Sequence, residues 1–233
     1  MKHKIYRIVC TALCCAPLLA TAQTGGKITS PQRLYEEGES LFRQKAFAAA
    51  MPPLQAFIKQ TDAEGAPVSA AGNKEEAEYM LVCAEYELRN PNSIELLREY
   101  LDTYPDTSHA NRICALIASA YFFEGKYDDA LAMFNSSRLD LLSNEERDDM
   151  TYRLATCYLK TGNVKEAAIW FETLRSTGSR YTADCTYYLA YIRYSQQRYD
   201  DALSGFLSLQ DNAKYEALVP YYIAEIYLIK KNY

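Results

Sequence analysis

The sequence predicts an all-α fold in which antiparallel helix pairs stack into a solenoid. The segment at residues 125–131, Gly-Lys-Tyr-Asp-Asp-Ala-Leu, recurs in related form at 162–168 and at 197–203. Its alanines, Ala130, Ala167 and Ala202, lie 37 and 35 residues apart, and a phenylalanine follows each of them four residues later. A unit of this length cannot bury its own apolar face, so neighbouring units must stack and leave a long curved surface.

The first 22 residues have the pattern of a secretory signal peptide. Three basic residues precede an apolar run from Ile8 to Leu19, and Ala20-Thr21-Ala22 supplies small residues for cleavage near Ala22. The apolar run of twelve residues is shorter than the ~20 that a membrane-spanning helix needs. We therefore expect export across the inner membrane, no transmembrane span in the mature chain, and a periplasmic or outer-membrane-associated location. Lipidation is the alternative, but Cys14 and Cys15 lack the usual Leu-small-small residues before them.

The mature chain divides into repeat units in a fixed order. Residues 23–30 are expected to be a flexible leader, and residues 61–74, rich in Ala, Gly and Asp, a linker. The predicted units are 31–60 (unit 1), 75–105 (unit 2), 110–142 (unit 3), 147–179 (unit 4) and 183–213 (unit 5), followed by 217–233 as the first helix of a truncated unit 6. Pro52-Pro53 is an obstacle in unit 1, because proline inside a helix costs about 3 kcal/mol.

The repeated residues have a structural reason. Alanines at equivalent places let the two helices of a unit approach closely, where larger side chains would overpack the contact. Glycine at the turn takes the left-handed conformation that ends the first helix. These structural repeat positions are Ala118, Gly125, Tyr127, Ala130 and Phe134 in unit 3; Ala155, Gly162, Ala167 and Phe171 in unit 4; and Ala190, Tyr199, Ala202 and Phe206 in unit 5.

This combination of small residue, turn glycine, tyrosine, alanine and phenylalanine resembles the tetratricopeptide repeat (TPR) family, from about Pro31 onward. The unit around Tyr199 departs from the pattern, since Gln197 replaces the turn glycine. Together with the signal peptide, the resemblance implies a TPR protein of the bacterial cell envelope, with a right-handed superhelix whose first helices line a concave groove. Carried onto this chain, the groove positions are Tyr152, Thr156, Tyr187, Tyr191, Tyr194, Tyr221 and Glu225. Packing between neighbouring helices is the alternative role for the same tyrosines.

The net charge argues against nucleic acid as a partner, and the cysteines allow two structural roles. After removal of residues 1–22, 22 basic and 30 acidic side chains remain, a net charge of −8, and no basic stripe favours nucleic acid. The four remaining cysteines permit disulfides in an oxidising compartment, or they are small buried thiols that fill the core, which we favour: Cys83, Cys114, Cys157 and Cys185.

The residue patterns of catalytic, metal and cofactor sites are missing from the sequence. His109 is the single histidine of the mature chain, and we expect it to cap or flank a helix. The aspartate pairs at 128–129, 148–149 and 200–201 are expected at helix starts, where the helix dipole favours negative charge. We predict no enzyme activity and no cofactor.

The leading hypothesis is a non-enzymatic protein-protein interaction scaffold in the cell envelope that binds a peptide or protein segment in its groove, in a complex associated with the outer membrane. One alternative is a carbohydrate-binding module that uses the groove tyrosines. Another is the N-terminal sensory region of a larger protein, because the apolar helix near Tyr221 lacks a partner helix and the chain is expected to be a fragment. The sequence leaves open the partner's identity and the oligomeric state.

Overall fold

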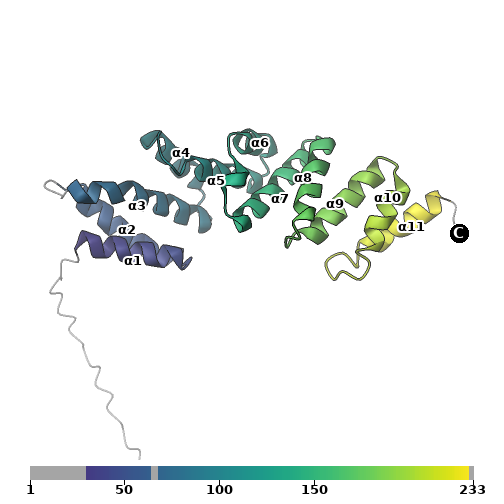
Figure 1. The fold of residues 1–233 in the computed structure, drawn as a ribbon, viewed down its shortest axis with the longest axis horizontal. Helices are drawn as coiled ribbons and strands as arrows, with labels where there is room; N and C mark the ends of the chain where they lie inside the picture. The colour runs from purple at the N-terminus through teal and green to yellow at the C-terminus, as the bar shows by residue number, and fades with distance from the viewer. Residues whose placement is uncertain (1–29, 64–67, 231–233) are drawn as a thin grey trace, which may run out of the picture.

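The computed structural model describes residues 30–63 and 68–230, which form α-helices, one short 3-10 helix and no strand (Figure 1). The predicted all-α helical solenoid is confirmed. The elements are α1 Pro31–Arg43, α2 Phe47–Thr61, α3 Val68–Glu87, α4 Ser93–Thr103, α5 Ala110–Phe123, α6 Tyr127–Asn135, the 3-10 helix η1 Leu139–Leu141, α7 Asn144–Lys160, α8 Val164–Ser176, α9 Thr182–Ser195, α10 Tyr199–Leu207 and α11 Val219–Ile229.

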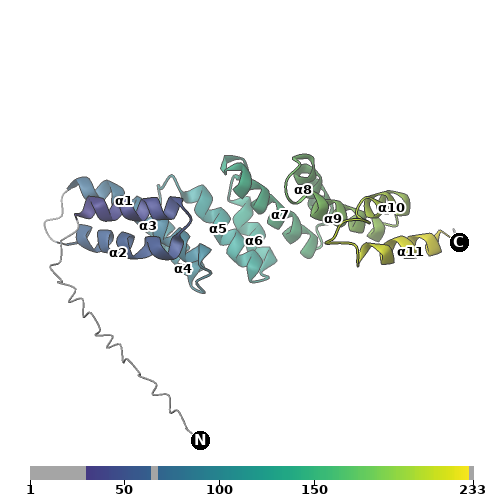
Figure 2. The same ribbon diagram turned by 90° about the horizontal axis from the view of Figure 1, so that it is seen from below.

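The helices pair in chain order and follow one another along the long axis of the molecule (Figures 1 and 2). Each odd-numbered helix is the first of its pair and each even-numbered helix is the second. The first helices also contact one another directly, α1 with α3, α3 with α5 and α5 with α7, whereas the second helices that the structure describes make no comparable contacts. The first helices from α1 to α7 therefore gather along one side of the stack, which we call the first-helix face.

The same turn closes all five helix pairs. One residue takes a left-handed conformation, and the next residue's N–H donates to the carbonyl five residues before it, as in the Schellman motif. Gly125 and Gly162 have φ angles of 74° and 82°, as the sequence predicts. The equivalent residues in the other three turns have side chains and nevertheless adopt φ angles of 59° to 61°: Lys45, Arg89 and Gln197.

Small residues sit where the two helices of a pair cross. The repeated alanines have no exposed surface: Ala118, Ala130, Ala155, Ala167, Ala190 and Ala202. A Cβ added to Gly205 on α10 would lie 2.8 Å from the Cβ of Ala190 on α9, and one added to Gly38 on α1 would lie 2.6 Å from Leu54 on α2. The helices are therefore as close as their side chains allow. The repeated phenylalanines fill the space beside these crossings: Phe134, Phe171 and Phe206.

Several predicted boundaries are wrong. The linker expected over 61–74 is shorter, because Thr61 still belongs to α2 and α3 begins at Val68. The first helix of unit 4 begins at Asn144 and not at 147, because Ser143 accepts a hydrogen bond from the Glu146 N–H and donates one to its carboxylate. Pro52 and Pro53 lie inside α2, past its first turn, so the helix continues despite the missing N–H donors.

Residues 1–29 lie outside the described part of the chain, and with them the predicted signal peptide and all but the last residue of the leader. That last residue, Ser30, caps α1: its side chain accepts from the Arg33 N–H. None of the helices that the structure describes is long and apolar enough to cross a membrane.

Candidate binding face

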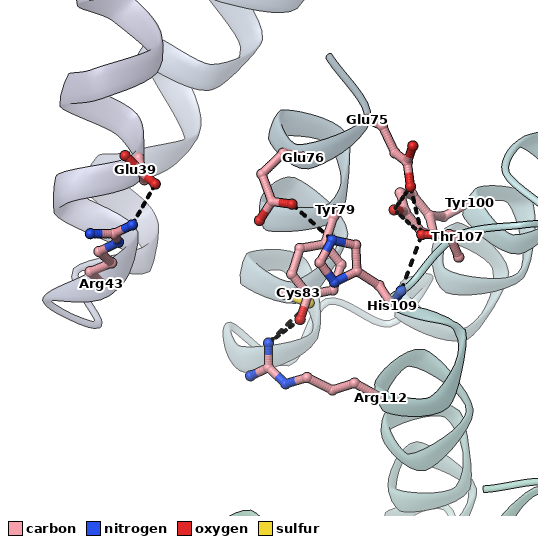
Figure 3. Close-up of polar contacts among 10 residues, drawn as sticks. All are labelled: Glu39, Arg43, Glu75, Glu76, Tyr79, Cys83, Tyr100, Thr107, His109 and Arg112. Carbon is pink, nitrogen blue, oxygen red and sulfur yellow. Dashed lines mark hydrogen bonds and ion pairs between the residues drawn. The ribbon is translucent and has the colours of Figure 1, made fainter. Parts of the chain in front are cut away.

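Charged and aromatic residues from two consecutive units meet where α3 approaches the start of α5 (Figure 3). Glu76 accepts a hydrogen bond of 2.8 Å from Nε2 of His109. The His109 ring also stacks on Tyr79, with 3.6 Å between centroids and 8° between planes. His109 occupies the N-cap position of α5, as expected, but its side chain makes no cap bond. It joins unit 2 to unit 3.

The same arrangement recurs between units 4 and 5. Asp149 on α7 accepts a hydrogen bond of 3.1 Å from the Tyr181 hydroxyl and one of 2.5 Å from Arg180. The Tyr181 ring stacks on Tyr152, with 4.4 Å between centroids and 10° between planes. The prediction that Asp149 marks a helix start is wrong, since it lies in the second turn of α7 and contacts the next unit.

A third copy joins α9 to the connection that precedes α11. Asp184 on α9 is buried and accepts hydrogen bonds from the Lys214 ammonium and the Tyr215 hydroxyl. Tyr215 stacks on Tyr187, with 4.7 Å between centroids and 15° between planes. Burial and the hydrogen bond to Asp184 raise the pKa of Tyr215, so this hydroxyl stays protonated and keeps donating. We call these three groups of acid, tyrosine and stacked ring the junction clasps.

The groove candidates that come first in the sequence have little free surface, mainly because of the junction clasps. Tyr152 and Tyr187 are partly buried and each has a ring of the following unit stacked on it. Thr156 is buried, and its hydroxyl donates to the Tyr152 carbonyl at 2.8 Å. These three residues therefore contribute mainly to packing within and between units.

The candidates nearer the C-terminus are more accessible. Tyr191 on α9 is 39% exposed and Tyr221 on α11 is 74% exposed. Glu225 is also exposed. Its carboxylate lies near the Tyr194 hydroxyl and, together with burial, raises the pKa of Tyr194 to about 12. Tyr222 joins the two helices, with its ring edge-to-face against both Tyr191 and Tyr194.

Helix α11 adds apolar surface to this group. Val219 and Ile226 are buried against the rest of the protein, while Leu228 is 61% exposed. Ala224 is exposed, although its equivalents in units 3, 4 and 5 are fully covered. We call five of the exposed residues of α9 and α11 the tyrosine surface: Tyr191, Tyr221, Ala224, Glu225 and Leu228.

Other titratable groups are engaged in structure. Among the described residues, no three His, Cys, Asp or Glu side chains come together as metal ligands would. The four cysteines are free thiols, three of them buried and Cys114 partly buried. Burial raises the pKa of the thiols of Cys83, Cys157 and Cys185 to about 12. Such thiols are protonated at neutral pH, and protonated thiols are poor nucleophiles.

Comparisons with known proteins agree with this architecture. Residues 115–181 match the model of the tetratricopeptide repeat family. The crystal structure of MamA protein is 16% identical with a TM-score of 0.55 and covers 80% of this chain and 93% of its own. A structure described as MamA AMB-1 is 18% identical with a TM-score of 0.58 and covers 79% and 92%, respectively. The pilF structure of Pseudomonas aeruginosa is 15% identical with a TM-score of 0.55 and covers 87% and 90%.

The family match thus covers residues 115–181, and the solved structures resemble the helical stack over most of the chain. At such identities the solved structures establish the shared fold alone. No curated protein matches the sequence at a significant level.

The junction clasps are the feature that the sequence reading missed. A signal was present, because an acid lies three residues before a tyrosine in three of the first helices, at Glu76, Asp149 and Asp184. An aromatic ring follows each of these tyrosines 28 to 30 residues later. That spacing is somewhat shorter than one repeat, so it places the ring just before or at the start of the next first helix.

Proposed function

We propose that this chain is a non-enzymatic interaction scaffold of the bacterial cell envelope, and that it binds a segment of another protein on the tyrosine surface. The observation that carries the proposal is the exposure of Tyr221 and Leu228, 74% and 61%, on a helix whose opposite side is buried. Large apolar side chains exposed together in this way mark interaction sites, because covering them removes apolar area from water.

The composition of the tyrosine surface favours a protein partner over a sugar. Tyrosine gives a large contact area and a polar tip at a low entropic cost, which suits protein recognition. A sugar would need several convergent hydrogen-bonding groups besides the rings, and apart from the tyrosine hydroxyls the surface offers one carboxylate, Glu225, which lies beside Tyr194. Helix-in-groove docking or an extended segment would both suit an apolar face next to α9.

The envelope location rests on the signal-peptide pattern of residues 1–22 and stays a proposal. Fractionation of cells that express the tagged full chain tests it. We expect the mature protein, shortened near Ala22, in the periplasmic or outer-membrane fraction. An unprocessed chain in the cytosol would contradict this part of the proposal.

Site-specific photo-crosslinking tests the binding surface. A photoreactive phenylalanine analogue replaces Tyr221 on the tyrosine surface or, as the matched control, Ile169 on the second helix α8, which is 58% exposed. We expect a discrete protein adduct in envelope extracts at position 221 and none at position 169. Equal adducts at both positions, or none at 221, would refute the proposed surface. Retention on a glycan array by the unmodified protein, lost in Tyr221→Ala, would favour the carbohydrate alternative.

A further inference from the structure

A second exposed aromatic residue lies on the first-helix face, about two units away from the tyrosine surface. Phe123, the last residue of α5, is 48% exposed. The guanidinium carbon of Arg89, in the turn after α3, lies 3.9 Å from the centre of this ring, and that of Arg153 on α7 lies 4.9 Å from it. Three consecutive units thus bring two cations to one exposed ring.

A hydrogen bond to a buried residue holds the side chain of Arg153 in place. Its guanidinium donates to the hydroxyl of Ser119, which has no exposed surface. Ser119 also accepts a hydrogen bond of 2.6 Å from the buried Tyr86 hydroxyl. A side chain held in this way loses little further freedom when it binds a ligand, so the site is pre-organised.

Neither guanidinium has a carboxylate partner of its own at close range in the described part of the chain. Arg89 has no carboxylate within ion-pair distance among the described residues. The nearest carboxylate to Arg153 is Asp149 at 3.9 Å, and Asp149 is bonded more closely to Arg180 at 2.5 Å. The mature protein is otherwise acidic, so two incompletely paired arginines beside one ring are a local exception.

A shallow pocket adjoins the ring. It has a volume of 200 Å³, and Arg89, Phe123, Tyr86 and Ala120 contribute to its lining. The acid on its rim, Glu124, is paired with Lys126 at 2.7 Å. The pocket therefore offers an apolar wall next to positive charge, which is the complement of an apolar side chain next to a carboxylate.

We propose that Arg89, Phe123 and Arg153 form a second contact site, which binds an acidic side chain flanked by apolar residues in the partner protein. Guanidinium groups bind carboxylates through charge-assisted, often paired hydrogen bonds, so a carboxylate placed beside this ring finds a cation to pair with. The apolar neighbour of that acid packs on the exposed part of Phe123. This inference extends the proposed scaffold function, because it assigns a chemistry to the partner: an acidic segment at α3–α7 and an apolar segment at α9–α11.

A titration with short blocked peptides tests this site separately from the tyrosine surface. The probe is acetyl-Leu-Glu-Leu-amide and the neutral control is acetyl-Leu-Gln-Leu-amide, each followed by the side-chain Nε–H resonances of the arginines. We expect the acidic peptide to shift the resonances of Arg89 and Arg153 saturably, and the neutral peptide to bind at least tenfold more weakly. The shifts should shrink at high salt, since exposed ion pairs are screened.

Variants identify the residues involved. Arg89→Gln removes the charge but keeps a side chain at the same left-handed turn position, so folding is not altered by relief of backbone strain. This variant should weaken the binding of the acidic peptide at least fivefold. Arg198→Gln removes a guanidinium that is paired with Asp201 in another turn, and it should leave the affinity unchanged.

Equal affinity for the two peptides, no saturable binding of the acidic one, or unchanged affinity in Arg89→Gln would each overturn the inference. None of these results depends on Tyr221, so the photo-crosslinking outcome stands or fails by itself.

Discussion

Replacing Gln197 by glycine should stabilise the protein, although it removes a side chain. Gln197 closes the α9–α10 turn with a φ of 61°, a conformation that costs a residue with a Cβ about 1–2 kcal/mol. Gln197 N–H donates to the Tyr194 carbonyl at 2.9 Å and the following N–H, that of Arg198, donates to the Arg193 carbonyl at 2.9 Å. Glycine would keep both bonds and remove the strain.

The expected magnitude includes a loss in the unfolded state. Glycine gives the unfolded chain more freedom, which costs roughly 0.5–1 kcal/mol. The net gain in the free energy of unfolding is therefore about 0.5–1 kcal/mol. The adjacent Gln196 is the matched control, because it is equally exposed but has a φ of −85°. Gln196→Gly relieves no strain and should destabilise the protein by about 0.5–1 kcal/mol.

Urea unfolding followed by far-UV circular dichroism measures both variants. Stacked repeats can unfold in parts. Hydrogen exchange of the Arg198 amide, which donates across five residues of the turn, therefore measures the local stability. Opposite signs at the two neighbouring positions are the expected result. If Gln197→Gly lowers the stability as much as Gln196→Gly does, the strain argument for this turn is wrong.

The remaining predictions concern packing and the thiols. Gly38→Ala should destabilise by about 1–3 kcal/mol, because the new Cβ would lie 2.6 Å from Leu54; calorimetry against Gly125→Ala, whose Cβ would meet nothing within 4 Å and would cost only backbone strain, isolates the clash. Ala167→Arg places a charged chain at a position with no exposed surface and should unfold the middle of the stack; an unchanged urea midpoint would contradict the register. The thiols should resist an aromatic disulfide reagent at pH 8 in the native protein, with Cys114 the fastest, and all four should react after unfolding without reductant. Fewer than four reactive thiols then would indicate disulfides. Above pH 9 the unfolded thiols ionise while the three buried ones, with pKa values of about 12, do not, so stability should fall as the pH rises.

The repeat positions could be predicted because they depend on local rules. An alanine at a helix crossing or a glycine at a left-handed turn is needed in each unit for the same reason, so Ala167 and Gly162 are recognisable from spacing alone. The beginning of α3 could not be predicted in this way. Its first turns are rich in Ala and Gly and lack a capping pattern, so the helix and a linker look alike in the sequence.

The roles of the tyrosines depend on neighbours that the repeat pattern does not specify. Tyr187 and Tyr191 are four residues apart on one face of α9, and the resemblance assigns both to the groove. The structure stacks Tyr215 on the first and leaves the second 39% exposed. The difference comes from the connection between α10 and α11, whose path the local sequence does not determine. The Arg89–Phe123–Arg153 site was missed because its three residues come from three units.

The junction clasps also set a direction for the growth of the chain. In each clasp the acid and its tyrosine are made first, and the ring that covers them is made about 30 residues later, as with Tyr79 and His109. If the chain emerges with its N-terminus first, from a ribosome or across a membrane, the most recently completed of these helix pairs still holds its carboxylate in water. Each pair can close only when the following pair has begun to emerge, so the order of the clasps along the sequence sets the earliest order in which the stack can assemble.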